Sequence, residues 1–410
     1  PMADRDILLA LASKVAEIAH LPVMADTATL YRALNGLNPI RPVVLLDELP
    51  WNQLNHAHEL DLYCEDSYLR AVELAFRRTL YQWAHCPGDM LVKPFFALHR
   101  SVHIGSIGVT VEEDTLAADQ GNHIVAHRYH DQLPDWEALE KLHVPEITVD
   151  QALDDARRER LEGIFGDILP IRMTGVTHAG FFMPWDDLSM WRGAEPLMVD
   201  LVDRPEFIHA LMRRITDIRI ATLDKLEAMG LLDAYMPVLH CTAGLVDELP
   251  GDVSGTVTRQ NLWGRGTAQI FSAVSPAMHD AFEIEYAREF FKGFGLVYYG
   301  CCEPLDRKID VVKKLPNLRK ISITPWADVH AAAEQMGGDY VLARKPNPAA
   351  VAVPVLDEEA LRLDILDTLD ACRRSGTPCE FTLKDISSVC YRPDNLTRWE
   401  RVVKETVMNY

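Results

Sequence analysis

Two adjacent cysteines, Cys301 and Cys302, follow an apolar run in GLVYYGCCEPLDRK (295–308). On a regular strand, consecutive side chains point to opposite faces, so both sulfurs serve one site only where the strand breaks. Gly300 and Pro304 supply such a break. Paired thiols at a strand end suit zinc, which takes thiolate ligands and keeps them deprotonated. The alternative, which the local sequence leaves open, is that one or both cysteines pack as small apolar groups.

A histidine follows another predicted strand in the same way. His240 and Cys241, in LHCTAG, end the predicted strand 234–240 and would lie at the same edge as the thiols. Imidazole binds zinc and transfers protons, so His240 is a candidate third ligand or general acid; the alternative is a cap on a hydrogen-bond network. Cys390 follows the predicted strand 379–384 by several residues and is a further candidate ligand. Glu303, next to the thiols, is a candidate catalytic carboxylate.

A basic pair leaves the predicted strand in DYVLARKPNPAA. Arg344 and Lys345 could hold a carboxylate or phenolate of a substrate, with Asn347 orienting it and Lys345 as a candidate catalytic group. The alternative is a salt bridge between neighbouring strand–helix units.

Aromatic residues gather around Asp186 and Asp187 in the segment 178–193. Such a carboxylate-edged aromatic loop fits a flat organic ligand, although packing of the loop onto the protein explains it equally well. Trp185, Asp186 and Trp326 are therefore candidate substrate contacts.

The elements that position these residues alternate along the chain. Short β-rich runs lead through polar or Gly/Pro loops into amphipathic helices, which is typical of a parallel α/β sheet; this many units favours a (β/α)8 TIM barrel. Chemistry in such a barrel lies where the strands end. The predicted strands are 169–176, 234–240, 267–274, 295–299, 320–324, 339–344 and 379–384, and the clearest helices are 205–229, 276–293, 326–336 and 357–374.

The N-terminal part has a different pattern. Residues 1–35 and 66–84 have helical periodicity, with a Pro-rich stretch between them. We expect a helical extension over 1–84 and a barrel over 85–410, with 105–150 as an inserted loop region.

Composition excludes several classes of function. The chain has 410 residues, with 41 Lys and Arg against 61 Asp and Glu, a net charge of −20. Such a chain repels phosphate backbones and anionic lipid, so we expect no nucleic-acid or membrane partner. No stretch approaches the roughly 20 apolar residues of a membrane helix, and the first residues carry charges where a signal peptide is apolar. We expect a cytoplasmic protein with free thiols.

Several segments together resemble the uroporphyrinogen decarboxylase superfamily over most of residues 60–405. They are PLMVDLVDRPEFIHALMRRITDIRIATLDKLEAMG, WGRGTAQIFSAVSPAMHDAF, YYGCCEPLDRKIDVVKKLPNLRKISITPWADV and LARKPNPA. The resemblance implies a (β/α)8 barrel. It also implies one of two activities: cofactor-free decarboxylation of a tetrapyrrole, or methyl transfer to or from a corrinoid protein, often with zinc.

The decarboxylases of this superfamily carry an Arg-rich N-terminal signature, Arg-Gln-Ala-Gly-Arg-Tyr, which this chain lacks. Its methyltransferases hold zinc through His-x-Cys after a strand and a later cysteine. In this chain the histidine of that motif aligns with Tyr299 or Gly300, and its first cysteine aligns with Cys301 or Cys302. The later cysteine of the motif falls near Cys390. Adjacent cysteines after glycine also resemble the zinc pair of homocysteine methyltransferases.

The sequence therefore predicts a methyltransferase that moves a methyl group between a small molecule and the cobalamin of a corrinoid partner protein, as in anaerobic O-demethylation. Zinc would be held by His240, Cys301 and Cys302. One rival is a cofactor-free decarboxylase or lyase acting on a small carboxylic acid through Asp186, Arg344 and His240. The other is a non-enzymatic subunit that docks a corrinoid protein. A homodimer is left open.

Overall fold

The chain forms a mixed α/β structure around a parallel sheet of seven strands. The computed structural model describes residues 3–117 and 125–410. Neighbouring strands are parallel throughout the order β1-β15-β14-β13-β12-β11-β8. The strands are β1 (Val43–Leu46), β8 (Phe181–Phe182), β11 (Trp263–Gly266), β12 (Leu296–Tyr299), β13 (Leu318–Ile323), β14 (Val341–Arg344) and β15 (Cys379–Leu383).

The structure does not show the expected closed ring of strands. Across the described residues, the hydrogen-bonded order runs from β1 to β8 and does not return to β1. Two further parallel contacts lie outside this sheet: β2 (Phe96–His99) pairs with β7 (Ile171–Thr174), and Val176 forms a bridge with Leu232. The fold is thus α/β with a parallel sheet.

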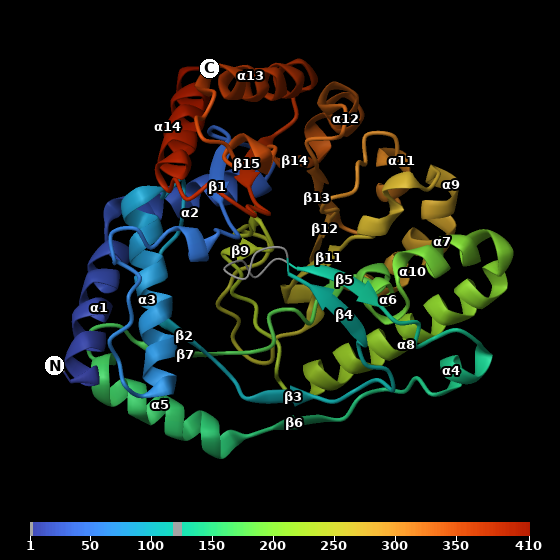
Figure 1. Ribbon diagram of the computed structural model, residues 1–410, viewed down its shortest axis with the longest axis horizontal. Helices are drawn as coiled ribbons and strands as arrows, with labels where there is room; N and C mark the ends of the chain where they lie inside the picture. Colours follow the sequence, from blue (N-terminus) through green and yellow to red (C-terminus); the bar gives the residue numbers. More distant parts are fainter. Residues whose placement is uncertain (1–2, 118–124) are drawn as a thin grey trace.

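Helices lie outside the strands of the sheet (Figure 1). Their ends follow local rules: Asp357 caps the N-terminus of α13 by accepting from the Ala360 amide, and Gly376 ends that helix in a left-handed conformation. The helices after β8 are α6 (Pro184–Arg192), α7 (Ala194–Asp203), α8 (Pro205–Ala228), α9 (Pro276–His279), α10 (Glu285–Phe290), α11 (Ile309–Val312), α12 (Val329–Met336), α13 (Glu358–Ser375) and α14 (Asp394–Asn409).

The two faces of the sheet have different neighbours. A Cβ atom at Gly264 would lie 2.5 Å from the Phe291 ring, which follows α10, so this position faces the helices. Arg344 also faces them, because its guanidinium lies 3.7 Å from Asp364 of α13. Since side chains alternate along a strand, Arg265 points to the opposite side, the inner face. We call the end of the sheet where β12 leads into Cys301 the mouth.

The N-terminal region contributes to the sheet as well as forming helices. Helices α1 (Asp4–Ala19), α2 (Pro22–Asn35) and α3 (Ser67–His85) confirm the predicted helical periodicity. Helices α1 and α3 pack with α5 (Gln151–Phe165) around a separate apolar cluster. Strand β1 lies within the expected extension 1–84 but pairs with β15 in the main sheet. The extension is therefore not wholly helical.

Most predicted elements are present. Helices α8, α12 and α13 confirm the predictions for 205–229, 326–336 and 357–374, and β7, β12, β13, β14 and β15 confirm five predicted strands. The predicted helix 276–293 is interrupted between α9 and α10 by a π-helical turn, Asp280–Ile284.

The strand predicted at 267–274 is wrong. Residues Gln269–Ala273 form a 3-10 helix, and the strand is β11, four residues earlier. The sequence of β11, WGRG, has two glycines and therefore a low strand propensity. Packing requires them, because a Cβ at Gly264 or Gly266 would collide with Phe291.

The predicted strand 234–240 is reduced to β9 (Val238–Leu239), which forms a short antiparallel pair with β10 (Thr242–Ala243). Pro237 precedes β9 and lacks the amide that a longer ladder needs.

The segment 105–150, expected to be an inserted loop region, contains regular elements. They include the antiparallel pair β4 (Glu113–Leu116) and β5 (Ala126–Tyr129), helix α4 (Trp136–Glu140), and β6 (Ile147–Val149), which pairs with β3 (Val102–Ile104). Residues 118–124 of this segment lie outside the described residues.

A search of the described helices for membrane spans finds none long and apolar enough to cross a bilayer alone. Helices α1 and α2 reach that length and composition only as a pair, with a bend of 59° between them.

The close contact between β7 and the 231–232 segment gives a stability prediction. A Cβ at Gly175 would lie 2.2 Å from the Leu231 carbonyl oxygen, a backbone atom with little room to move. We expect Gly175→Ala to lower the free energy of unfolding by about 1–3 kcal/mol, measured by urea denaturation. Gly163→Ala is the control: a Cβ there meets nothing within 4 Å, and in helix α5 it should stabilise by roughly 0.5–1 kcal/mol. Equal effects of the two substitutions would contradict this account.

Candidate active site

The two cysteines lie together at the mouth, where β12 ends. Gly300 has φ +101°, a conformation that favours glycine, and the predicted break in the strand is thereby confirmed. A Cβ at Gly300 would also meet the Ser322 side chain at 3.1 Å. Beyond this turn the sulfurs of Cys301 and Cys302 are 3.7 Å apart, with Cys301 buried and Cys302 half-buried. Both thiols therefore serve one location.

A lysine ammonium lies between these sulfurs and the neighbouring acid. Lys384, directly after β15, places Nζ 3.1 Å from the Cys301 sulfur, 3.6 Å from the Cys302 sulfur and 2.7 Å from Asp385. The Cys302 sulfur also lies 3.4 Å from a carboxylate oxygen of Asp385. One buried cation thus neutralises part of the negative charge gathered at the mouth.

The two thiols share one proton. A hydrogen bond donated by Cys302 lowers the pKa of Cys301, and His240 and Lys384 lower it further against the opposing effect of burial. The same hydrogen bond raises the pKa of Cys302. For Lys384, burial acts to lower the pKa, but the Cys301 charge and Asp385 outweigh it and raise the pKa. The favoured state is a Cys301 thiolate beside a Cys302 thiol and a Lys384 ammonium.

His240 is part of this cluster. Its Nε2 lies 3.7 Å from Glu48, which follows β1, and its imidazole lowers the pKa of the Cys301 thiol. Ligand atoms of Glu48, His240 and Cys241 lie within 4.8 Å of one another. Burial and the hydrogen bond to Asp385 raise the pKa of Glu48. Among the described residues, Glu48, His240 and Cys241 are therefore the one trio of donors close enough together to share an ion.

Three residues at the mouth have left-handed backbone conformations although they are not glycine: Glu48, Cys241 and Asp385, with φ between +50° and +55°. Such conformations cost energy and persist where surrounding contacts hold them, often at functional sites. Here they turn side chains from three different strand ends toward one point.

Glu303 lies beneath the thiols rather than beside them. Its fully buried carboxylate accepts hydrogen bonds from the Thr267 hydroxyl and from the amides of Ala268 and Cys301. Burial and the Cys301 charge raise the pKa of Glu303. The carboxylate therefore fixes the backbone that carries Cys301.

Arg344 and Lys345, predicted to act as a pair, point to opposite faces of the sheet. Arg344 donates to the Thr324 carbonyl and lies near Asp364 on the outer side of the sheet. Lys345 is buried on the inner face, where its ammonium donates to the Cys241 carbonyl. Asn347 accepts from the Ala349 amide and caps a short helix.

The two tryptophans predicted to contact the substrate differ in exposure. Trp185 is fully buried against Phe271, with its indole nitrogen donating to the Phe282 carbonyl. Trp326 is 70% exposed on the loop after β13. Asp186 accepts from the side chain of Gln269 at 2.7 Å, and burial raises its pKa. Cys390 is half-buried in a left-handed turn, its amide bonded to Ser388.

Three basic groups of the inner face were not predicted from the sequence: Arg265 of β11, Lys320 of β13, and Lys384. Together with the predicted Lys345, they are nearly or fully buried and follow or lie within strands of the sheet. The Lys320 ammonium lies 3.3 Å from Glu380, and burial lowers its pKa to about 8. Basic residues inside otherwise apolar runs, as in KISI and FTLK, are the signal that could have revealed them.

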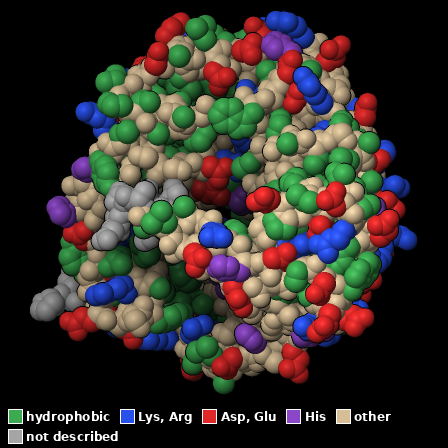
Figure 2. Space-filling model, turned by 45° about the vertical axis from the view of Figure 1, so that its right-hand side comes forward, with side chains coloured by type: hydrophobic (Ala, Val, Ile, Leu, Met, Phe, Trp, Pro, Cys, Tyr) green, Lys and Arg blue, Asp and Glu red, His purple; other side chains and the backbone are tan. Residues whose placement is uncertain are grey.

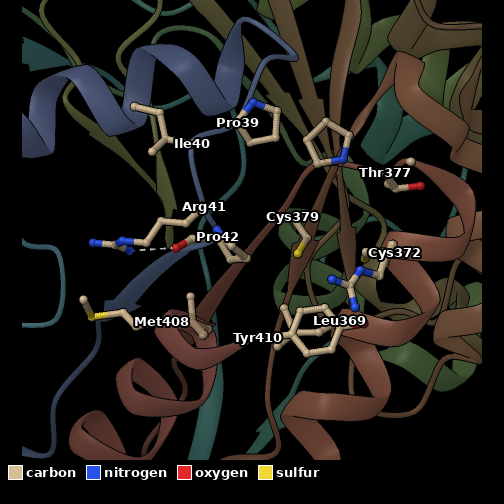
Figure 3. Close-up of a pocket in the computed structure, with 14 residues that line it drawn as sticks. Pro39, Ile40, Arg41, Pro42, Leu369, Cys372, Thr377, Cys379, Met408 and Tyr410 are labelled. Carbon is tan, nitrogen blue, oxygen red and sulfur yellow. Dashed lines mark hydrogen bonds between the residues drawn. The ribbon is translucent and has the colours of Figure 1, made fainter.

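The face of the molecule drawn in Figure 2 has a central hollow, with acidic side chains and a histidine at its floor. A cavity of about 630 Å³ lies at the opposite end of the strands, lined by Pro42 and Pro378, which precede β1 and β15 (Figure 3). Two free thiols, Cys372 and Cys379, line that cavity. It does not include the residues of the mouth.

Comparison with known proteins identifies no family. No family model matches the chain, and no curated protein matches it. One solved structure, a methyltransferase from Methanosarcina mazei, aligns with 92% of this chain and 97% of its own length, at 12% identity and a TM-score of 0.47.

The thiol pair gives a titration prediction. Lys384 holds a positive charge against the thiolate, so Lys384→Met should raise the pH at which the thiolate appears by about 1 to 3 pH units. Ultraviolet thiolate absorbance across a pH series measures this, with Cys301→Ser identifying the signal. Lys313→Met, which removes an ammonium bonded to the Gln335 carbonyl, is the control and should leave the curve in place. An unchanged titration in Lys384→Met would contradict the assignment.

Proposed function

We propose that this protein is a methyltransferase that moves a methyl group between a small molecule and a corrinoid protein, with zinc bound at the mouth. The residues that resemble the uroporphyrinogen decarboxylase superfamily support the reaction class. We further propose that the sheet is the larger part of a (β/α)8 barrel continued by β2 and β7, and that the protein works in the cytoplasm, where its eight free cysteines stay reduced.

One observation carries the proposal: the placement of the two sulfurs. Two sulfurs bound to one zinc ion at about 2.3 Å each, at a tetrahedral angle, lie about 3.8 Å apart. Cys301 and Cys302 already have a separation of 3.7 Å. We take His240, whose imidazole lowers the pKa of Cys301, as the third donor, and Glu48 offers a carboxylate oxygen 3.7 Å from its Nε2. Two thiols, an imidazole and a carboxylate fit zinc.

The residues of the mouth would divide the work. Cys301, Cys302 and His240 would hold the metal, which supplies Lewis-acid activation of the thiol or ether oxygen that accepts or releases the methyl group. Lys384 contacts both sulfurs. When the sulfurs bind the metal, Lys384 would either move away from them or stay beside them and balance their negative charge. Glu303 keeps the Cys301 amide in place.

Metal content tests the ligand assignment. Protein purified without chelator should contain stoichiometric zinc, and the double variant Cys301→Ala/Cys302→Ala should lose it. The matched control is Cys372→Ala/Cys379→Ala, which removes two free thiols at the opposite end of the strands and should retain the metal. Equal zinc in both doubles would reject the assignment.

Activity is tested with free cob(I)alamin as the methyl acceptor and methoxylated aromatic compounds as donors, followed by absorbance. The methyl group leaves the ether oxygen, which keeps the electron pair of the broken bond and takes up a proton. Wild-type protein and the Cys372/Cys379 control should turn over. The Cys301/Cys302 double variant should lose at least about 100-fold in rate, because mutation of even the outer hydrogen-bond partners of a metal site typically costs about 10- to 100-fold.

A second function is favoured by Lys384, because a side-chain cation already occupies the position beside both sulfurs. The candidate is a cofactor-free decarboxylase or lyase acting on a small carboxylic acid, with Lys384 and His240 at the substrate. Full turnover after exhaustive chelation would favour this function over methyl transfer.

A further inference from the structure

Arg265 is a buried arginine on the inner face, directly beside the strand that carries the thiols. It lies in β11 between Gly264 and Gly266, whose positions face Phe291 and the outer helices. Its side chain therefore points inward, and the residue is only 1% exposed. In the register of the sheet it lies opposite Tyr298 of β12 and Phe181 of β8.

The guanidinium of Arg265 lacks the carboxylate that buried arginines normally have. Arg192 is equally buried and bonds to Asp131 and Asp200, and Arg344 lies near Asp364. Across residues 3–117 and 125–410, no carboxylate oxygen lies within 4 Å of Arg265. Its Nε has no hydrogen-bond partner, and its Nη1 meets only the sulfur of Met183 at 2.7 Å, a weak acceptor.

Aromatic rings do not replace that partner. The guanidinium carbon lies 5.3 Å from the Phe181 ring centre and 6.0 Å from that of Tyr298. Such contacts stabilise a cation less than burial destabilises it, and they leave the planar N–H fork unused. A guanidinium keeps its charge in proteins, so the unused N–H groups of Arg265 favour an anionic group supplied from outside the chain.

An anion bound by Arg265 would lie in the electrostatic field that also acts on the residues of the mouth. Its charge acts on the Cys301 sulfur, on Asp186 and on His178. Asp186 does not bond to it, because that carboxylate is held by Gln269. A ligand held by Arg265 would meet the rings of Phe181 and Tyr298, which flank the guanidinium.

We propose that Arg265 binds the carboxylate of the substrate and that the substrate is an aromatic carboxylic acid. This inference rests on the proposed function, whose methyl donor or acceptor it narrows to a class. A carboxylate matches the fork of the guanidinium with two parallel hydrogen bonds, and a flat ring matches the two flanking aromatic side chains. A dianion such as phosphate would meet stronger repulsion from Glu48, Asp186 and Asp385 around the mouth.

Calorimetric binding of benzoate tests this, with benzamide as its uncharged isostere. Wild-type protein should bind benzoate more tightly than benzamide, and Arg265→Gln should weaken benzoate by about 10- to 100-fold while leaving benzamide nearly unchanged, as expected for loss of charge-assisted hydrogen bonds. Arg265→Lys keeps the charge without the fork and should bind with intermediate affinity. Arg319→Gln removes a strand arginine that is paired with Glu248, and it should bind as wild type does.

Each result is decisive. Equal binding of benzoate and benzamide by the wild type, or undiminished benzoate binding by Arg265→Gln, would overturn the proposal. Inorganic phosphate that competes as well as benzoate would also overturn it, because the site would then select charge alone. Benzoate binding requires neither zinc nor a corrinoid. Wild-type protein that contains no zinc when purified without chelator, yet binds benzoate through Arg265, would therefore reject the metal site and keep this inference.

Discussion

Positive charge buried on the inner face of the sheet is the constraint on which the site depends. An ion removed from water loses several kcal/mol of solvation, which only close counter-charges or hydrogen bonds offset. Lys320 has Glu380, Lys345 has the Cys241 carbonyl, and Lys384 has the two sulfurs and Asp385. Each buried cation thereby fixes a neighbouring strand end, and the mouth is assembled as a consequence.

The segment after His240 shows how this works. The Thr242 hydroxyl and the Ala243 amide donate to Glu380, and the Ala243 carbonyl accepts from Lys320 at 2.8 Å. The Asn35 amide also donates to that carbonyl, at 3.0 Å. These buried bonds over-determine the chain and hold Cys241 in its left-handed conformation. His240 is therefore brought to Cys301 by ionic contacts that lie deeper in the sheet.

Sequence patterns predicted the helices and strands more successfully than they predicted the contacts of the side chains. Strand β12, the break at Gly300 and helix α8 follow from apolar runs, glycine and helical periodicity, all of which act locally. Strand β11 was missed, because its glycines are chosen by contact with Phe291 far along the chain. The faces of Arg344 and Lys345 could not be assigned either, since the strand boundary sets which of the two points inward.

The charge of the whole chain and the charge of its inner face have opposite signs. The net charge of −20 argues against binding a polyanion at the surface. At the inner face, however, Arg265, Lys320, Lys345 and Lys384 are buried together, and low-dielectric surroundings strengthen their fields over short distances. Surface charge is screened within about 8 Å in physiological salt. The local field therefore governs what binds there, and a small monoanion suits both the basic interior and the acidic rim better than a tetrapyrrole with many carboxylates.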